Sequence, residues 1–333
     1  MDVTRSEFED LVGAYALDAC DSEEAAAIDA YIAEHADAAK EAERLRDAAA
    51  WLGAVGALNP PSDLRSRLLA AAAERPSPLP PVDALRSESE RFEALLGSLE
   101  PADLGVETYN GLTVRDLVTH VAIVDEAFVE AAFAIETGAP TWSFIGADAV
   151  AEMTEAQLPE TAAWSFEEIR DRCRRARRAL IELDATLPAD ARFGGYSLRS
   201  VLVIRAFETW THHHDITSAL GRAEAPVAAP VLRAMADLAI QTLPIALAAR
   251  GYDYPGRTAR VVMSGPGGGD WTIACGAHDV AGPVPDVVLR VPVVEFCRRF
   301  ADRLAVDAVP FEVDGDAELG RALVDAAPAF AGL

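Results

Sequence analysis

A glutamate and a histidine four residues apart are the side chains of this sequence best suited to chemistry. They lie in RAFETWTHHHDITSALGR, residues 205–222. In a helix, residues at i and i+4 share one face, so Glu208 and His212 lie side by side there and Asp215 returns to the same stripe. Carboxylates and imidazoles are ligands that divalent metals take from proteins. The spacing therefore predicts two ligands of a metal site.

The two histidines that follow do not extend this pair. His213 and His214 turn away from the shared face by about one and two steps of 100°. A third ligand should come from a facing helix, as in other metal sites built in helical bundles. Of the remaining histidines, His35 lies near the N-terminus and His278 in the C-terminal part, which leaves His120.

His120 lies in the middle of TVRDLVTHVAIVDEAF, among apolar residues that form one helix face. A histidine on the apolar face of a bundle helix points inward. With Glu208 and His212 it gives two neutral imidazoles and one carboxylate, a set that suits Zn²⁺ with an open coordination position and also non-haem Fe(II). Each feature also has a purely structural interpretation: His120 as a hydrogen-bonded core side chain, and Glu-x-x-x-His as part of a solvated helix.

Two charged residues beside these ligands are our candidate catalytic residues. Asp215, one turn after His212, is placed to orient a ligand imidazole; otherwise it is an exposed helix carboxylate. Arg205, one turn before Glu208, is placed to neutralise that carboxylate or a substrate anion; otherwise it is a surface arginine.

The charge of the chain disfavours several classes of partner. The 333 residues include 29 basic and 54 acidic side chains, a formal net charge of −25. Such a surface repels phosphate backbones and anionic lipids, so we expect no nucleic-acid and no membrane partner. No apolar run reaches the roughly 18 to 20 residues of a membrane span. The most basic segment, RDRCRRARR at 170–178, is predicted to be a solvated helix face.

The N-terminus and the cysteines indicate the compartment. The chain begins MDVTRSEFED, with acidic residues where a signal peptide has basic ones. Its four cysteines are widely scattered and form no C-x-x-C pair, which is typical of a reducing compartment. We therefore expect a cytoplasmic protein.

The patterns along the chain predict a multi-domain, mostly α protein. Residues 1–75 have apolar residues at helical spacing, and the proline-rich residues 76–81 predict a stiff linker. Residues 82–252 predict a helical bundle that carries the metal site. Residues 253–333 combine short β-rich runs with helical segments, which predicts a small α/β domain.

Long amphipathic segments define the bundle. They lie at about 82–99, 113–137, 165–184 and 197–220, and a further helix follows at about 226–250. A stretch rich in prolines and glycines, 138–160, separates the second from the third.

In the C-terminal part, RTARVVMSG and DWTIACG are joined by PGGG, which predicts a β-hairpin. The segments PDVVLRV and FEVDGD each lead into a helical segment. The glycine cluster 265–269 lacks a following Lys-Ser/Thr and does not open a helix, so we expect a turn rather than a phosphate-binding loop.

Two motifs in the bundle resemble a known family. Segment 82–222 resembles the metal-binding domain of the mycothiol-dependent maleylpyruvate isomerase family, part of the DinB-like bundle superfamily. The matching elements are GLTVRDLVTH, which ends in His120, and RAFETWTHHHDITSALG, which resembles the family's Glu-x-x-x-His-x-x-Asp helix. The resemblance implies metal ligation by His120, Glu208 and His212. Residues 256–333 resemble the family's C-terminal α/β domain through VVMSGPGGGDWTIACG and FEVDGDAEL.

The N-terminal part resembles a different family. LVGAYALDACDSEEAAAIDAYIAEHADAAKEAERLR, followed by PPSDLRSRLLAAAAE, is similar to the zinc-binding helical domain of bacterial anti-sigma factors. That family carries His-x-x-x-Cys-x-x-Cys, where this sequence has Tyr31, His35 and Ala38. Because structural zinc needs four good ligands, we expect the helices here to fold without zinc.

These resemblances imply two hypotheses. The first is a metal-dependent enzyme with mycothiol as cosubstrate: metal coordination lowers the pKa of a thiol, and the thiolate adds to a small electrophile, giving isomerisation or net S-transfer. The second is a cytosolic anti-sigma-like regulator, in which residues 1–75 bind a sigma factor or another helical protein and the bundle senses a thiol or a metal. We rank the enzyme first, because function is argued from the site.

Overall fold

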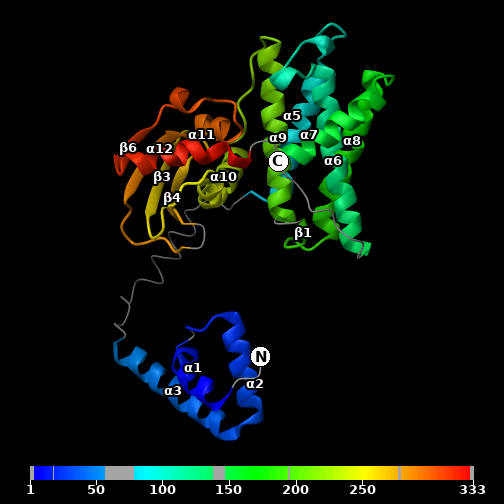
Figure 1. The fold of residues 1–333 in the computed structure, drawn as a ribbon. Helices are drawn as coiled ribbons and strands as arrows, with labels where there is room; N and C mark the ends of the chain where they lie inside the picture. Colours follow the sequence, from blue (N-terminus) through cyan, green and yellow to red (C-terminus); the bar gives the residue numbers. More distant parts are fainter. Residues whose placement is uncertain are drawn as a thin grey trace. The chain divides into compact units, whose positions relative to one another are not determined.

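The computed structural model describes residues 4–17, 19–56, 79–137, 147–193, 196–276 and 279–330. The chain divides into two compact units, Met1–Pro76 and Ser77–Leu333, and Figure 1 shows that helices dominate both. The prediction of a multi-domain, mostly α protein with a small α/β part is confirmed. The short helix predicted before residue 76 and most of the predicted linker lie outside the described residues.

Among its described residues, the N-terminal unit has the helices α1 (Arg5–Ala16), α2 (Ser22–Glu34) and α3 (Ala36–Gly56). Asp21 begins α2 as the sequence indicated: its carboxylate accepts from the Glu24 backbone N–H, while the Glu24 carboxylate accepts from the Asp21 N–H. Apolar side chains from all three helices pack together; the buried ones are Phe8, Val12, Tyr15, Ile28, Ala38 and Ala42.

Aromatic packing occupies the positions where the anti-sigma-like family carries its zinc ligands. The ring of Tyr31 stacks on His35 at 4.1 Å between centroids and on Phe8 at 5.1 Å, and Ala38 is fully buried. Among the described residues of this unit, the helices therefore pack at these positions through rings and a methyl group. The anti-sigma resemblance itself stays a prediction.

Four helices of the second unit form the bundle: α5 (Pro81–Gly97), α6 (Val114–Thr137), α8 (Phe166–Thr186) and α9 (Leu198–Ala219). α5 packs along α9 and α6 packs along α8, and Figure 1 shows the four helices side by side. Side-chain caps fix where two of them begin, because Ser165 and Ser197 accept hydrogen bonds from the first-turn backbone of α8 and α9. α9 is buried on nearly all faces, so it is the central helix of this unit.

The proline- and glycine-containing stretch 138–160 contains a helix that the sequence did not reveal. This is α7 (Ala147–Gln157), followed by a 3₁₀ turn at Leu158–Thr161. A second unpredicted feature is a minimal antiparallel hairpin, β1 (Arg192–Phe193) and β2 (Tyr196–Ser197), just before α9. α7 packs against α6, and it supplies one wall of the site described below.

The C-terminal part contains a four-stranded sheet in the order β4-β3-β5-β6. β3 pairs antiparallel with β4 and parallel with β5, and β5 pairs antiparallel with β6. The predicted hairpin is thus confirmed, and two strands lead directly into helices as expected. The elements are β3 (Thr258–Ser264), β4 (Gly269–Ala274), β5 (Val287–Pro292), α11 (Val293–Phe300), β6 (Glu312–Gly315) and α12 (Ala317–Ala326).

The glycine cluster forms the turn between β3 and β4, as predicted. Gly267 has φ +83°, and a Cβ atom on it would lie 2.5 Å from the backbone oxygen of Ala229. Only glycine fits such a close approach. The cluster therefore lets the hairpin pack closely against Ala229, the first residue of the helix α10 (Ala229–Ala249).

α10 (Ala229–Ala249) packs on two sides. It contacts α9 and α5 of the bundle, and also β4, α11 and α12 of the C-terminal part. Among the described residues it is the one helix long and apolar enough to cross a membrane, and 56% of its apolar window is buried. Packing between two layers accounts for that apolarity. The domain boundary predicted at residues 252/253 stays a prediction. α10 ends before this boundary and packs against elements on both sides of it.

Candidate metal and thiol site

The three predicted metal ligands line one cavity of the second unit. The cavity has a volume of about 670 Å³, and its walls come from α6, α7, α9, α10 and the residues just after α11. His120 projects from α6, and Glu208 and His212 from α9. The helix faces inferred from sequence spacing are therefore brought to a common space.

The two imidazoles lie next to each other and are oriented from behind. Their ring centroids are 5.3 Å apart with the planes perpendicular. His120 Nδ1 lies 2.8 Å from Thr154 Oγ1, and His212 Nδ1 lies 3.1 Å from Asp215 Oδ2. In both rings the partnered atom is Nδ1, so among the described residues Nε2 is the atom left for coordination. A hydrogen bond to the other ring nitrogen is the usual support of a metal-ligating histidine.

The environment of His120 favours its neutral form. Burial lowers the pKa of this imidazole well below its ordinary value, and the neighbouring His212, Arg205 and Arg303 act in the same direction. A metal ligand must carry a lone pair, which only the neutral imidazole has. His120 is therefore in the protonation state that a metal requires.

Arg205 is fully buried and holds the third candidate ligand. Its guanidinium forms an ion pair with Glu208, and its Nε donates to Asp125 Oδ1 at 2.7 Å. The surface interpretation of Arg205 is therefore wrong, and the interpretation in which it neutralises Glu208 agrees with the contacts. Arg205 does not line either cavity, so its geometry is that of a positioning residue rather than a catalytic one.

A second buried arginine completes this support. Arg177 Nε donates to Asp125 Oδ2 at 2.8 Å, and its Nη1 donates to Thr209 Oγ1 at 2.6 Å. Asp125 is fully buried between the two guanidinium groups. Arg177 belongs to the basic segment 170–178 that we expected to be solvated, and for this residue the expectation is wrong.

The three candidate ligands share a wall without forming a closed coordination sphere. In the described part of the chain, no three His, Cys, Asp or Glu side chains stand close enough together to hold a metal ion. The donor chemistry fits a divalent metal: two imidazoles with Nε2 available and a carboxylate that line one cavity. The Glu208 carboxylate forms its ion pair with Arg205.

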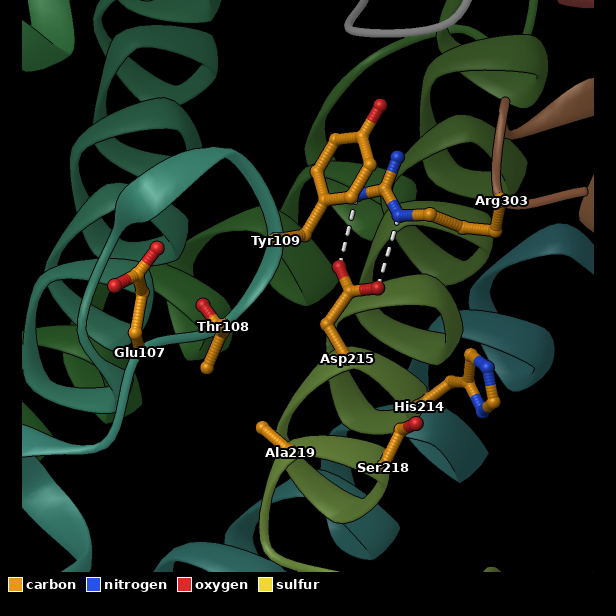
Figure 2. A pocket seen from close by; sticks show the side chains of 8 residues that line it. All are labelled: Glu107, Thr108, Tyr109, His214, Asp215, Ser218, Ala219 and Arg303. Carbon is orange, nitrogen blue, oxygen red and sulfur yellow. Dashed lines mark hydrogen bonds and ion pairs between the residues drawn. The ribbon is translucent and has the colours of Figure 1, made fainter.

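Asp215 connects the bundle to the C-terminal part. Arg303 donates to its two oxygens from Nε and Nη2, each at 2.8 Å. Figure 2 shows the Arg303 guanidinium between Asp215 and the ring of Tyr109, whose centroid lies 3.4 Å from Arg303 Cζ. Burial alone would raise the pKa of Asp215, but the hydrogen bonds from Arg303 and His212 lower it to about 2. Asp215 is therefore a buried carboxylate and not an exposed one.

A smaller, polar cavity lies beside the large one. Its volume is about 350 Å³, and it shares Tyr109 and Arg303 with the larger cavity. Hydroxyl and charged groups of Thr108, Ser218 and Glu107 line it (Figure 2). The site thus has a polar part and a less polar part that meet at Arg303.

Sequence reasoning missed several residues of this site. Arg303 and Tyr109 come from segments far from the ligands in the chain and carried no motif. Thr154 lies on the unpredicted helix α7. Asp125 did carry a signal, because it is one of two charged residues within the apolar run VAIVDEAF; a charge on a buried helix face needs a partner.

Another cluster of charges lies around His213 and His214; neither lines the larger cavity, and His214 lines the smaller one. His214 Nδ1 lies 3.0 Å from Glu224 Oε2, which also accepts from Arg298.

Nearby on α5, Glu88 is 1% exposed. Its Oε2 accepts from Arg91 at 2.6 Å, while Oε1 has no partner among the described residues. Burial raises the pKa of Glu88 to about 7 against the opposing charge of Arg91.

The raised pKa of Glu88 makes stability depend on pH. Below about pH 4.5 both the folded and unfolded forms hold the proton; between 4.5 and about 7 only the folded form does, so stability falls as pH rises through this window. We expect Glu88→Gln to remove this fall, a gain relative to wild type of at most about 3 kcal/mol between pH 5 and pH 8. Urea unfolding at the two pH values measures it, with the exposed Glu90→Gln on the same helix as control. Equal pH dependence in wild type and Glu88→Gln would contradict the assignment.

Comparison with known proteins finds a similarity that lies in the bundle. Residues 85–217 match the family model described as the mycothiol maleylpyruvate isomerase N-terminal domain. This match runs from α5 into the end of α9 and covers less than half of the chain. The bundle that carries the three candidate ligands is therefore similar to this domain, as its motifs indicated.

Two solved structures are also similar to this chain. One is the crystal structure of the mycothiol-dependent maleylpyruvate isomerase, at 18% sequence identity and a TM-score of 0.47. The other is a histidine-to-alanine mutant of such an isomerase, at 17% identity and the same TM-score. Each similarity covers 70% of this chain and 91% of that chain. No curated protein matches the sequence.

Proposed function

We propose that the second unit catalyses the addition of a low-molecular-weight thiol, mycothiol, to a small electrophile, with a divalent metal such as Zn²⁺ held by His120, Glu208 and His212. The observation that carries this proposal is the pair of neighbouring imidazoles on one cavity wall, each with Nδ1 engaged from behind and with a carboxylate beside them. The family match of the bundle supports the choice of thiol. When bound, the metal would supply the charge that keeps the thiol sulfur deprotonated at neutral pH.

Other residues of this chain would position the metal ligands and the reactants. Thr154 and Asp215 hold the two imidazoles in place. Arg205 holds the charge of Glu208 in a buried position. Arg303, which lies where the two cavities meet, binds Asp215 and leaves its other face against Tyr109. Thiol and electrophile would thus meet beside a rigid polar frame, which is the condition for efficient reaction between bound groups.

The bonding changes balance in either outcome. The thiol gives up its proton and its sulfur forms a C–S bond to an electron-poor carbon of the electrophile. In an isomerisation, the attacked C=C bond becomes single and rotates, and the C–S bond then breaks so that the sulfur leaves with its electron pair. In an S-transfer, the adduct keeps the C–S bond and takes up a proton, or expels a leaving group with its electron pair.

Metal content tests this proposal. We expect about one equivalent of zinc or another divalent metal per chain in purified wild type, and its loss in His120→Ala and in Glu208→Ala. His214→Gln is the matched control, because it lies on the same helix but pairs with Glu224 outside the large cavity. Calorimetric titration with mycothiol should then show binding that requires the metal. Absence of metal after reconstitution would contradict the proposal.

The regulatory alternative rests on the resemblance of residues 1–75 alone. A sigma factor as partner of the N-terminal helices stays a prediction, which a pull-down with the full chain tests.

We also propose a cytoplasmic location for the protein. All four cysteines are free, which supports this placement.

A further inference from the structure

Much of the lining of the larger cavity, including residues on the same helix as Glu208 and His212, is apolar. Side chains from three helices and from the 3₁₀ turn contribute to it, and Phe300 ends α11 at its edge. Its volume of about 670 Å³ is in the range of small-molecule sites. The apolar residues used here are Val150, Leu158, Ile204, Phe207, Leu238 and Phe300.

The charges that line this cavity are nearly all matched by protein partners. Arg303 is the one Lys or Arg among its described lining residues, and Asp215 accepts two hydrogen bonds from it. Glu208 is paired with Arg205, and Asp302 with Arg299 at 3.2 Å. This leaves the exposed Glu155, an acid, at the rim.

A divalent metal and the thiolate bound to it would together contribute one positive charge, which is one fewer than a dicarboxylate needs. A dianionic substrate would therefore enter with one charge unmatched, and burying an unpaired charge is costly.

We infer that the larger cavity binds an uncharged, apolar electrophile of about the size of a substituted arene, and rejects dicarboxylates. This inference deepens the proposed function, since it names the class of molecule that the thiol would attack. It rests on the apolar lining and on the matched charges, and both belong to the protein without any metal. The cavity's discrimination can therefore be measured separately from turnover.

A matched series of unreactive nitroarenes tests the inference on the full chain without metal or thiol. The series is 1,3-dinitrobenzene, 3,5-dinitrobenzoate and 5-nitroisophthalate, which carry no, one and two carboxylates. By calorimetric titration we expect binding to weaken by at least about tenfold with each carboxylate. Equal or tighter binding of the carboxylates would overturn the inference, and so would absence of binding by the neutral compound.

A charge introduced into the cavity lining provides the second arm. Thr242 lines the cavity from α10, and its hydroxyl donates only to carbonyls of its own helix. We expect Thr242→Arg to tighten 3,5-dinitrobenzoate by about tenfold and to leave 1,3-dinitrobenzene nearly unchanged. Thr242→Gln, which adds length without charge, should keep the wild-type ratio. The same gain in both variants would overturn the inference.

Turnover separates this inference from the proposed function. Metal-loaded protein and mycothiol are mixed with 1-chloro-2,4-dinitrobenzene or with its carboxylated analogue 4-chloro-3,5-dinitrobenzoate. The thiolate forms a C–S bond at the carbon that bears chlorine, and chloride leaves with the electron pair. Faster consumption of the neutral compound supports both proposals, whereas faster consumption of the carboxylate overturns the inference alone. Binding of the neutral nitroarene without any thiol consumption supports the inference and counts against the proposed function.

Discussion

Asp125→Ala is expected to lower the free energy of unfolding by about 3 to 5 kcal/mol, the largest effect on stability that we predict. Asp125 is fully buried and pairs with both Arg205 and Arg177. Removing its carboxylate leaves two buried guanidinium groups without their shared counter-ion, and such groups cannot regain water. Urea unfolding of wild type and variant measures the difference.

An exposed pair of the same kind is the control for this prediction. Asp270 pairs with Arg260 on the sheet, and both side chains are 47% exposed. We expect Asp270→Ala to cost no more than about 1 kcal/mol, because water replaces the lost contact. Asp125→Asn, which keeps the shape but removes the charge, should resemble Asp125→Ala. Similar losses in Asp125→Ala and Asp270→Ala would show that burial does not strengthen the first pair.

Asp215→Asn is expected to weaken metal binding by about 10- to 100-fold, the largest effect on the proposed site apart from loss of a ligand. The Asp215 carboxylate accepts from the candidate ligand His212 and from Arg303. An amide in its place loses the charge that orients the His212 ring and leaves Arg303 without a counter-ion. Competition with a chelator of known affinity measures the change.

Glu224→Gln is the matched control for this second prediction. Glu224 also contacts a histidine of α9, since His214 Nδ1 lies 3.0 Å away, but neither residue lines the large cavity. Its substitution should leave metal affinity within about twofold of wild type, as expected for a contact outside the ligand set. If Asp215→Asn and Glu224→Gln have the same affinity, Asp215 does not position the ligand.

The helical periodicity of the sequence was sufficient to predict most of the fold and part of the site. The bundle helices and the C-terminal hairpin appear close to their predicted bounds, because amphipathic spacing and turn residues are local signals. The i, i+4 spacing predicted that Glu208 and His212 share one helix face. His120 was predicted to point inward from an apolar helix face, and all three residues line the same cavity. Whether these three hold a metal stays a prediction.

The parts that could not be predicted depend on contacts between distant segments. Nothing near Arg205 in the chain indicates that Asp125, 80 residues earlier, is its partner. Arg303 pairs directly with Asp215, which lies 88 residues earlier in the chain. The helix α7 lies in a stretch whose prolines and glycines obscured it. Pairing across the fold is set by packing, which a local pattern does not contain.

The two-sided packing of α10 has an evolutionary consequence. A chain cut after Gly251 would strip the sheet of the helix that covers it, and one cut before Ala229 would uncover the apolar side of α9. Recombination at either place would expose an apolar surface, which favours aggregation. Substitutions on α10 are also constrained from both sides at once. The bundle and the C-terminal sheet should therefore be inherited together, with compensating changes on the faces that meet α10.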